Sequence, residues 1–209
     1  MTTKKKQKPR KIKMNIDALL PRPKPVSWRD AHYYIQHAHE YPIMGTWLMD
    51  GWEETGLTPV VVARRQAEDK VIFGVFLVDF YCLGVKNAYC NGDFSLKRFQ
   101  SELETMCSGQ PEACDPGLAH ELIYGGIEYA RRYGFEPHTD FNLASKVLDP
   151  VEAWPQKYKL KFGKDGKPLF VSGPYDNVDR IMAKLRRTAG DGNFDFLVGF
   201  VEEGDFGEG

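Results

Sequence analysis

The amino-acid sequence predicts a single α+β domain in which several amphipathic helices pack on a mixed or antiparallel sheet. Strand-like segments come first along the chain, helices follow, and a hairpin, a helix and a strand come last. That order is typical of an α+β fold, because alternating strand–helix units would predict a parallel sheet instead. The length of 209 residues and the hydrophobic content of 42% fit one folded domain, which we expect to span residues 27–201.

Charge sets the two ends of the chain apart from this domain. Residues 1–26 are expected to form a disordered arm that is basic at first and then proline-rich, and residues 202–209 an acidic tail. A basic arm concentrates near phosphate groups, so nucleic acid is a suitable partner; a solvated tail without a specific role is the alternative. The basic residues of the arm are Lys4, Lys5, Lys6, Lys8, Arg10, Lys11 and Lys13.

The domain is expected to open with a helix and a loop. The helix should run from Trp28 to about Glu40, with Ser27 as its N-cap. The following segment, GTWLMDGWEETG, is interpreted as a loop that presents Trp47 and Trp52. Such a loop suits a protein partner, so a protein–protein adaptor is one alternative function.

Two apolar segments then predict strands. Leu57–Arg65 contains Pro59, which cannot donate to a ladder, so we expect this strand to start at a sheet edge. The next strand begins near Val71 and is apolar on both faces, which places it inside the sheet. Gly84 should break it, with Val85–Cys90 continuing as a further strand or bend.

Caps and apolar stripes predict two helices in the middle of the chain. Ser95 is the expected N-cap of the first, and Asp115 with Pro116 starts the second, which Gly134 ends. Gly126 lies in the apolar stripe of the second helix, where another backbone can approach closely. The stripe of the first helix contains Leu96, Phe99, Leu103, Met106 and Cys107.

Two neighbouring residues of the second helix carry polar groups. His120 lies just outside the apolar stripe, and Glu121 is expected on the polar face. Their side chains point about 100° apart, so they do not face one ion together.

The last third of the chain predicts four short elements. Asp140–Leu148 should form a short helix, and Lys159–Val171 a hairpin that turns at Asp165-Gly166. Asp176 is the expected cap of the next helix, and Phe194–Val201 the final strand.

Asp79, at the end of the buried strand, is the first candidate for chemistry. A buried carboxylate needs a cation or several hydrogen-bond donors, and Lys86 can return to it if the chain bends. A structural ion pair or turn cap is one interpretation. The other interpretation is catalytic: Asp79 would act with His138 and Asp140 in a metal-dependent nuclease or phosphodiesterase. Only this interpretation requires a cofactor, which is a divalent metal. The simpler interpretation of His138 and Asp140 is a turn that leads to Asp140 as the N-cap of the next helix.

The remaining motifs exclude several classes of protein. The spacing of Cys82, Cys90, Cys107 and Cys114 does not fit a zinc ribbon or finger, so no structural metal is expected. The sequence has no GxxxxGK[ST], GxGxxG or GxSxG motif, which disfavours phosphate-loop ATPases, dinucleotide oxidoreductases and ordinary serine hydrolases.

A second basic region supports a nucleic-acid partner. Lys157, Lys159 and Lys161 alternate with apolar residues, so one face of the expected strand is all lysine. Such a surface suits a phosphate backbone, RNA in preference to DNA; a face that only keeps the hairpin soluble is the alternative. The other basic residues of this surface are Lys164, Lys167, Arg186 and Arg187.

The fragments VDFYCLGVK, YGFEPHTDF and LRRTAGDGNFDF resemble segments of an uncharacterised bacterial protein family. The resemblance covers roughly Leu57 to Val201, implies a bacterial intracellular protein, and transfers no activity or site. No apolar run is long enough to span a membrane, and the N-terminus lacks an apolar segment. We therefore expect a cytoplasmic protein without a membrane partner.

Overall fold

The computed structural model describes residues 31–198. The seven basic residues of the arm, the acidic tail, and the predicted cap Ser27 with Trp28 lie outside the described residues. The end of the strand predicted over Phe194–Val201 lies outside them as well.

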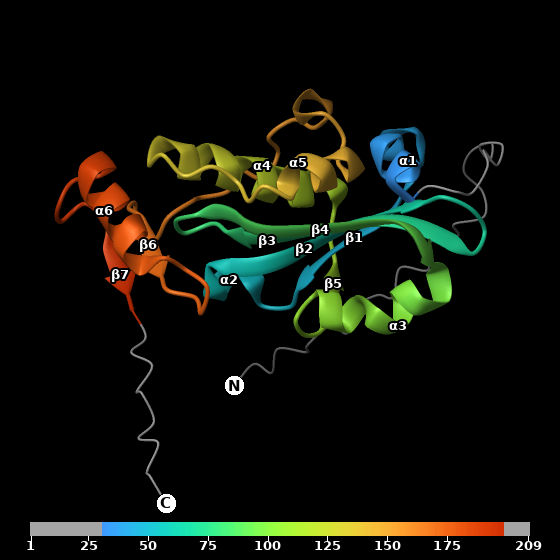
Figure 1. Ribbon diagram of the computed structural model, residues 1–209, viewed down its shortest axis with the longest axis horizontal. Helices are drawn as coiled ribbons and strands as arrows, with labels where there is room; N and C mark the ends of the chain where they lie inside the picture. The colour runs from blue at the N-terminus through green and yellow to red at the C-terminus, as the bar shows by residue number, and fades with distance from the viewer. Residues whose placement is uncertain (1–30, 199–209) are drawn as a thin grey trace, which may run out of the picture.

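A five-stranded antiparallel sheet forms the centre of the fold, with strand order β4-β3-β2-β1-β5 (Figure 1). The α+β class is thus confirmed, and of the two sheet types predicted the antiparallel one is found. The strands are β1 Ile43–Met49, β2 Leu57–Arg65, β3 Lys70–Asp79, β4 Gly84–Ser95 and β5 Pro111–Ala113.

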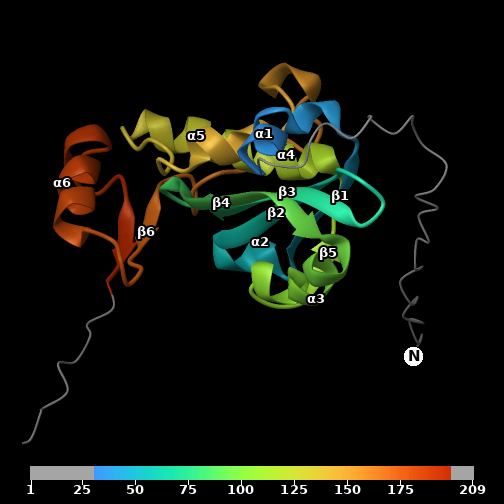
Figure 2. The same cartoon turned by 45° about the vertical axis from the view of Figure 1, so that its right-hand side comes forward.

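Helices cover both faces of this sheet. Figure 2 shows α1, α4 and α5 on one face and α3 on the other, while α6 packs at one end of the molecule. The α-helices are α1 Ala31–Gln36, α2 Trp52–Thr55, α3 Leu96–Met106, α4 Pro116–Arg132, α5 Phe141–Ala144 and α6 Val178–Thr188. Short 3-10 turns follow α1 at Ala38–Glu40 and α5 at Ser145–Val147, with another at Val151–Ala153.

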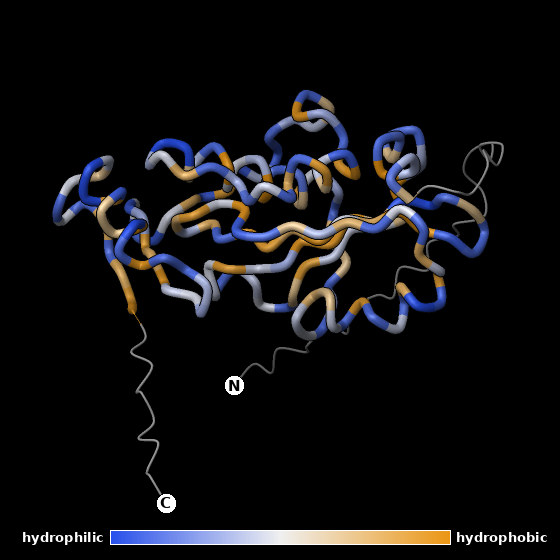
Figure 3. The backbone as a smooth tube through the Cα atoms, in the orientation of Figure 1, coloured by the Kyte–Doolittle hydropathy of each residue, from blue (hydrophilic) through white to orange (hydrophobic). Residues whose placement is uncertain are grey.

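Alternate residues of the central strands face the two helical layers, because successive side chains of a strand point to opposite faces. In β2, Val60 and Val62 belong to the core under α4, whereas Val61 and Ala63 belong to the core over α3. Figure 3 shows these strands as the most hydrophobic part of the backbone. The prediction that the strand beginning near Val71 is buried on both faces and lies inside the sheet is confirmed for β3, which lies between β2 and β4.

Helix α3 covers only part of its face of the sheet. Phe73 of β3 meets Phe94 and Phe99 there, with ring centroids 5.1 and 5.3 Å apart. Farther along the same face of β3, Leu77 and Asp79 line a cavity instead.

The predicted loop with two exposed tryptophans is wrong. Its first half is strand β1, in which Trp47 packs on Phe99 of α3 with ring centroids 5.6 Å apart. Its second half contains α2, in which Trp52 is 9% exposed and packs on Phe80. The alternation of side chains along β1 explains the difference, since Leu48 belongs to the core under α4 and Trp47 packs on the core over α3.

The edge predicted for the start of β2 is found only at its first residues, because β2 as a whole lies between β1 and β3. Pro59 is tolerated there for a local reason. Pairing between β1 and β2 stops at Val60, so Pro59 has a partner only in β3, at Leu77. Its missing N–H therefore falls where one neighbouring strand has already ended.

The caps predicted for α3 and α4 are confirmed. Ser95 Oγ accepts a hydrogen bond from Arg98 N–H (3.2 Å), and Asp115 Oδ1 accepts one from Gly117 N–H (2.7 Å). The close approach at Gly126 is confirmed too. A Cβ built on that glycine would lie 3.9 Å from the backbone Cα of Gly84 and 3.1 Å from Val78 Cγ1, so a larger residue would crowd both.

The predicted hairpin over Lys159–Val171 is right at its turn and wrong in its strands. A single bridge between Lys164 and Lys167 closes the turn at Asp165-Gly166. Lys159 has a φ of 50°, which interrupts the extended run before the turn. The residues after the turn form β6, which pairs in parallel with β7. These strands are Leu169–Val171 and Asp195–Leu197.

The N-cap of α6 is Asn177, whose side chain accepts a hydrogen bond from Arg180 N–H (3.0 Å). The prediction of Asp176 as the cap is wrong by one residue. The Asp176 carboxylate is turned toward Lys86 of β4, with Nζ and Oδ2 2.6 Å apart.

Candidate functional site

A loop rich in lysine, Lys157–Lys167, lies against α4 and is here called the lysine loop. Glu121 of α4 holds its first part, because the Glu121 carboxylate accepts hydrogen bonds from Tyr158 N–H (2.8 Å) and Leu160 N–H (2.9 Å). The side chain of Glu121 is therefore buried, with the residue 9% exposed. The predicted solvent-exposed position of Glu121 is wrong, because the lysine loop covers that face of the helix.

Two further contacts fix the middle of the lysine loop. Gly163 N–H donates to the carbonyl of Phe80 (2.9 Å), the residue that follows β3. The ring of Phe162 occupies the space beside Gly125 of α4, where a Cβ would lie 2.4 Å from Cζ. The loop is thus docked through its backbone and through alternate side chains.

The docked loop turns three lysines to solvent. Lys157, Lys159 and Lys161 are exposed, as predicted, although the segment is not a strand. Lys157 Nζ lies 4.0 Å from an Asp115 oxygen, and within residues 31–198 no ion pair involves the other two. The residues between them are half-buried: Tyr158, Leu160 and Phe162.

An aromatic ring borders this row of charges. The ammonium of Lys164 lies 5.4 Å from the ring centroid of Tyr81. A cavity of about 340 Å³ next to them is lined by Tyr81, Lys161 and Lys164 together with Trp52 and Leu160. A cation beside a half-buried aromatic ring at the rim of a cavity suits the base and phosphate of a single nucleotide.

Two of the other basic residues predicted for this surface already have acidic partners. Lys167 pairs with Asp195 at 2.9 Å, and Arg186 lies 3.8 Å from Asp191. Arg187 is exposed in the last turn of α6. Nearby acids therefore compensate two of these three charges.

The second candidate is Asp79, which is 6% exposed at the end of β3. Its Oδ1 accepts hydrogen bonds from Tyr81 N–H (3.0 Å) and Cys82 N–H (2.9 Å), so it caps the turn between β3 and β4. Burial raises the pKa of the Asp79 carboxyl from 3.8 to about 6, against the opposing effects of the backbone donors and the charge of Lys86. The predicted ion pair goes elsewhere, because the Lys86 ammonium binds Asp176.

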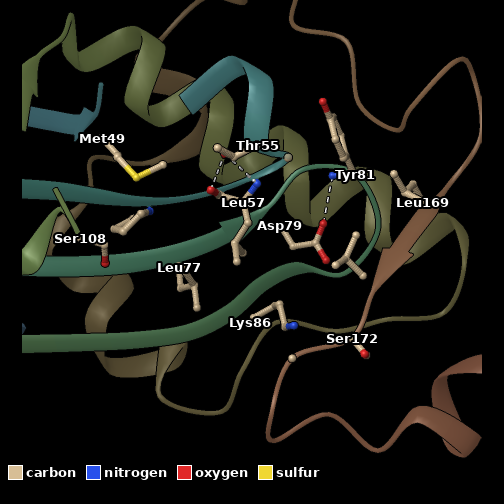
Figure 4. Close-up of a pocket in the computed structure, with 14 residues that line it drawn as sticks. Met49, Thr55, Leu57, Leu77, Asp79, Tyr81, Lys86, Ser108, Leu169 and Ser172 are labelled. Carbon is tan, nitrogen blue, oxygen red and sulfur yellow. Dashed lines mark hydrogen bonds between the residues drawn. The ribbon is translucent and has the colours of Figure 1, made fainter. Parts of the chain in front are cut away.

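Asp79 lines a cavity of about 380 Å³ between the open end of the α3 face and strand β6 (Figure 4). Most of its wall is apolar, and Lys86 contributes the other charged group. Representative lining residues are Met49, Leu57, Leu77, Tyr81, Leu169 and Val171.

The three residues of the nuclease alternative do not line one cavity. His138 lines a different cavity of about 530 Å³, beside Lys86 and α6. Asp140 is next to His138, with Oδ2 and Nδ1 3.6 Å apart, and its side chain makes no cap hydrogen bond. Within the described part of the chain, no group of three or more His, Cys, Asp or Glu side chains is placed to hold a metal ion.

The remaining reactive side chains belong to the core. Burial raises the pKa of the Cys107 thiol to about 11 and raises that of Cys82 further, so neither is a ready nucleophile. His120 is 6% exposed and its Nε2 lies 3.2 Å from the carbonyl of Pro150. Burial lowers the pKa of His120, which favours its neutral form.

Arg64 of β2 is a buried cation that the sequence interpretation missed. It is 2% exposed and donates to the carbonyls of Val147 (2.6 Å) and Tyr41 (2.7 Å) and to Asp149 Oδ1 (2.6 Å). The burial of Arg64 could have been predicted from the sequence, since alternation along the strand places it on the same face as Val62, under the helices. These contacts tie the segment after α5 to the sheet, so Arg64 is structural.

None of the protein-family models, curated proteins or solved structures compared with the chain matches it. The resemblance to an uncharacterised bacterial family therefore stays a prediction. No helix within residues 31–198 is long and apolar enough to cross a membrane.

Proposed function

We propose that the protein associates with nucleic acid, RNA in preference to DNA, through the lysine loop and the basic N-terminal arm. The observation that carries the proposal is the docking of the lysine loop on α4. Glu121 and the half-buried side chains hold its backbone, so that Lys157, Lys159 and Lys161 all face solvent. A fixed row of cations loses less conformational freedom on binding phosphates than a row on a mobile chain.

Single-stranded RNA is the form we favour. The ring of Tyr81 lies next to Lys164 and borders the cavity that Lys161 also lines. Stacking of a base on an aromatic ring, with phosphates near adjacent lysines, is the usual way in which proteins bind single strands. Such binding fits the cytoplasmic location that the sequence predicts.

The test compares two double variants of equal charge change. Lys159→Glu with Lys161→Glu alters the lysine loop, whereas Lys97→Glu with Lys146→Glu alters exposed lysines on α3 and after α5. We expect the first variant to weaken the binding of a single-stranded RNA by about tenfold or more at low salt, and the control to have a much smaller effect.

The salt dependence separates phosphate contacts from unspecific adsorption. The logarithm of the association constant should fall linearly with the logarithm of salt concentration, by about 0.7 for each phosphate neutralised. The loop variant and a chain lacking residues 1–13 should each show a shallower slope. Equal affinities and slopes for the wild type, the loop variant and the control would refute the proposal.

We do not extend the proposal to catalysis or to an adaptor role. Asp79 and His138 line separate cavities, and the two tryptophans expected to meet a protein partner pack into the fold instead.

A further inference from the structure

The cavity next to Asp79 is separate from the cavity beside the lysine loop, although Tyr81 lines both, and it has its own chemistry. It lies where the α3 face of the sheet is left uncovered, and Leu169 and Val171 of β6, from a distant part of the chain, line it as well (Figure 4). Its volume of about 380 Å³ is in the range of small-molecule sites in proteins. Two of its apolar lining residues, Leu57 and Val171, are 38% and 46% exposed, so an apolar ligand would remove further hydrophobic surface from water.

The charges at one end of the cavity are unbalanced. Figure 4 shows the side chains of Asp79 and Lys86 near each other at the wall of the cavity. Lys86 donates to Asp176 at 2.6 Å, and both of these side chains are 14% exposed. Asp79 receives hydrogen bonds from backbone N–H groups alone within the described residues. Two carboxylates, Asp79 and Asp176, therefore face one ammonium, which is paired with Asp176, so the group carries one negative charge in excess.

We propose that this cavity binds a small organic cation, a primary amine carried on an apolar chain or ring, whose ammonium pairs with Asp79. The amine would supply the missing positive charge, and the apolar body would lie between Leu57, Leu77 and Val171. A charge-assisted hydrogen bond in a site shielded from water is stronger than one at the surface, which favours the amine over an alcohol of the same size.

A carboxylate ligand bound by Lys86 is the rival, and the geometry disfavours it. The Lys86 ammonium already has Asp176 as its partner, and a second anion would come close to the Asp79 carboxylate. Like charges at such short range weaken binding.

The proposal predicts how binding varies with pH. The charged and titratable groups around Asp79 are Lys86, Asp176, Tyr81 and Cys82. The pKa of Asp79 is raised by burial to about 6, while an alkylamine stays protonated far above that value. Affinity for the amine should therefore be highest above about pH 7 and should fall as Asp79 becomes protonated below about pH 6.

The experiment uses the full chain and three probes of similar size: hexylamine, hexanol and hexanoate. Binding is followed by amide chemical shifts and titration calorimetry at about pH 8. We expect saturable binding of hexylamine with shifts at Tyr81, Cys82 and Val171, weaker binding of hexanol, and none of hexanoate. Asp79→Asn should reduce the affinity for hexylamine by about tenfold or more and remove its pH dependence.

A second variant keeps the test valid if the first changes the fold. Val171→Trp fills the cavity without altering Asp79, and Val151→Trp places the same side chain at an exposed position outside that cavity. The first should abolish binding of the amine and the second should leave it unchanged. Absence of saturable hexylamine binding, equal binding of hexylamine and hexanol, or tighter binding of hexanoate would each overturn the proposal. RNA binding is expected to be unaffected by Val171→Trp, so the two proposals can fail separately.

Discussion

Replacing Asp79 by asparagine tests how the buried carboxylate affects the stability of the fold. Asn retains a side-chain oxygen that can accept the hydrogen bonds from Tyr81 N–H and Cys82 N–H. It removes the negative charge that burial disfavours. The variant therefore separates the function of Asp79 as a turn cap from the cost of ionising it inside the protein.

The expected magnitude follows from the pKa of Asp79, which is raised in the folded protein from 3.8 to about 6. Well below about pH 4 the carboxyl is protonated in both states, and its ionisation costs no stability. Between about pH 4 and 6 the unfolded chain loses the proton first, so the free energy of unfolding falls as the pH rises. Each pH unit between the two pKa values corresponds to about 1.4 kcal/mol, which gives a total of about 3 kcal/mol.

The assay is urea unfolding of both proteins between about pH 4 and pH 8. The stability of Asp79→Asn relative to the wild type should increase by up to about 3 kcal/mol across that range and level off above about pH 7. Asp50→Asn, at an exposed position, serves as the control and should stay within about 0.5 kcal/mol throughout. A variant that loses stability relative to the wild type as the pH rises would show that the attraction of Lys86 outweighs the cost of burial, and would refute the reasoning.

Three further substitutions test the packing around α4 and β2. Glu121→Ala should lower the free energy of unfolding by about 2–4 kcal/mol, because two backbone N–H groups of the lysine loop lose their acceptor. Urea unfolding midpoints measure this loss, and the control Glu128→Ala, on the exposed face of α4, should change the midpoint little. Gly126→Leu should cost about 1–3 kcal/mol or more by overpacking against Val78, and an unchanged melting temperature would contradict the close approach. Arg64→Met should cost about 3–5 kcal/mol, since Asp149 and two carbonyls lose their donor; a thermal midpoint equal to that of the wild type would contradict it.

The sequence alone determined the elements whose signals are local. Helices α3 and α4 are predicted within a residue or two. Their first residues follow the caps Ser95 and Asp115, and the 3.6-residue period of their apolar side chains, with Gly134 after α4, gives their extent. The apolar run of β3 likewise shows that Asp79 is buried. Such features depend on residues close in sequence, because capping bonds and helix periodicity link positions only a few residues apart.

The candidate sites were predicted only in part. Alternation in the lysine loop indicated that Lys157, Lys159 and Lys161 point the same way, and the structure shows them exposed although no strand forms. The cavity beside Asp79 was not predictable, because its far wall, Leu169 and Val171, comes from β6. Nothing local in either segment indicates that they meet.

Only the tertiary structure decided which polar side chains are buried. Glu121 lies on the polar side of α4 by periodicity, yet a loop that follows much later in the chain covers it and donates two hydrogen bonds to it. Trp47 was misplaced for the same reason, because the neighbour that buries it is α3. The position of β2 inside the sheet likewise depends on β1, which ends beside Pro59. Periodicity reports the direction in which a side chain points, whereas burial depends on what a distant segment places there.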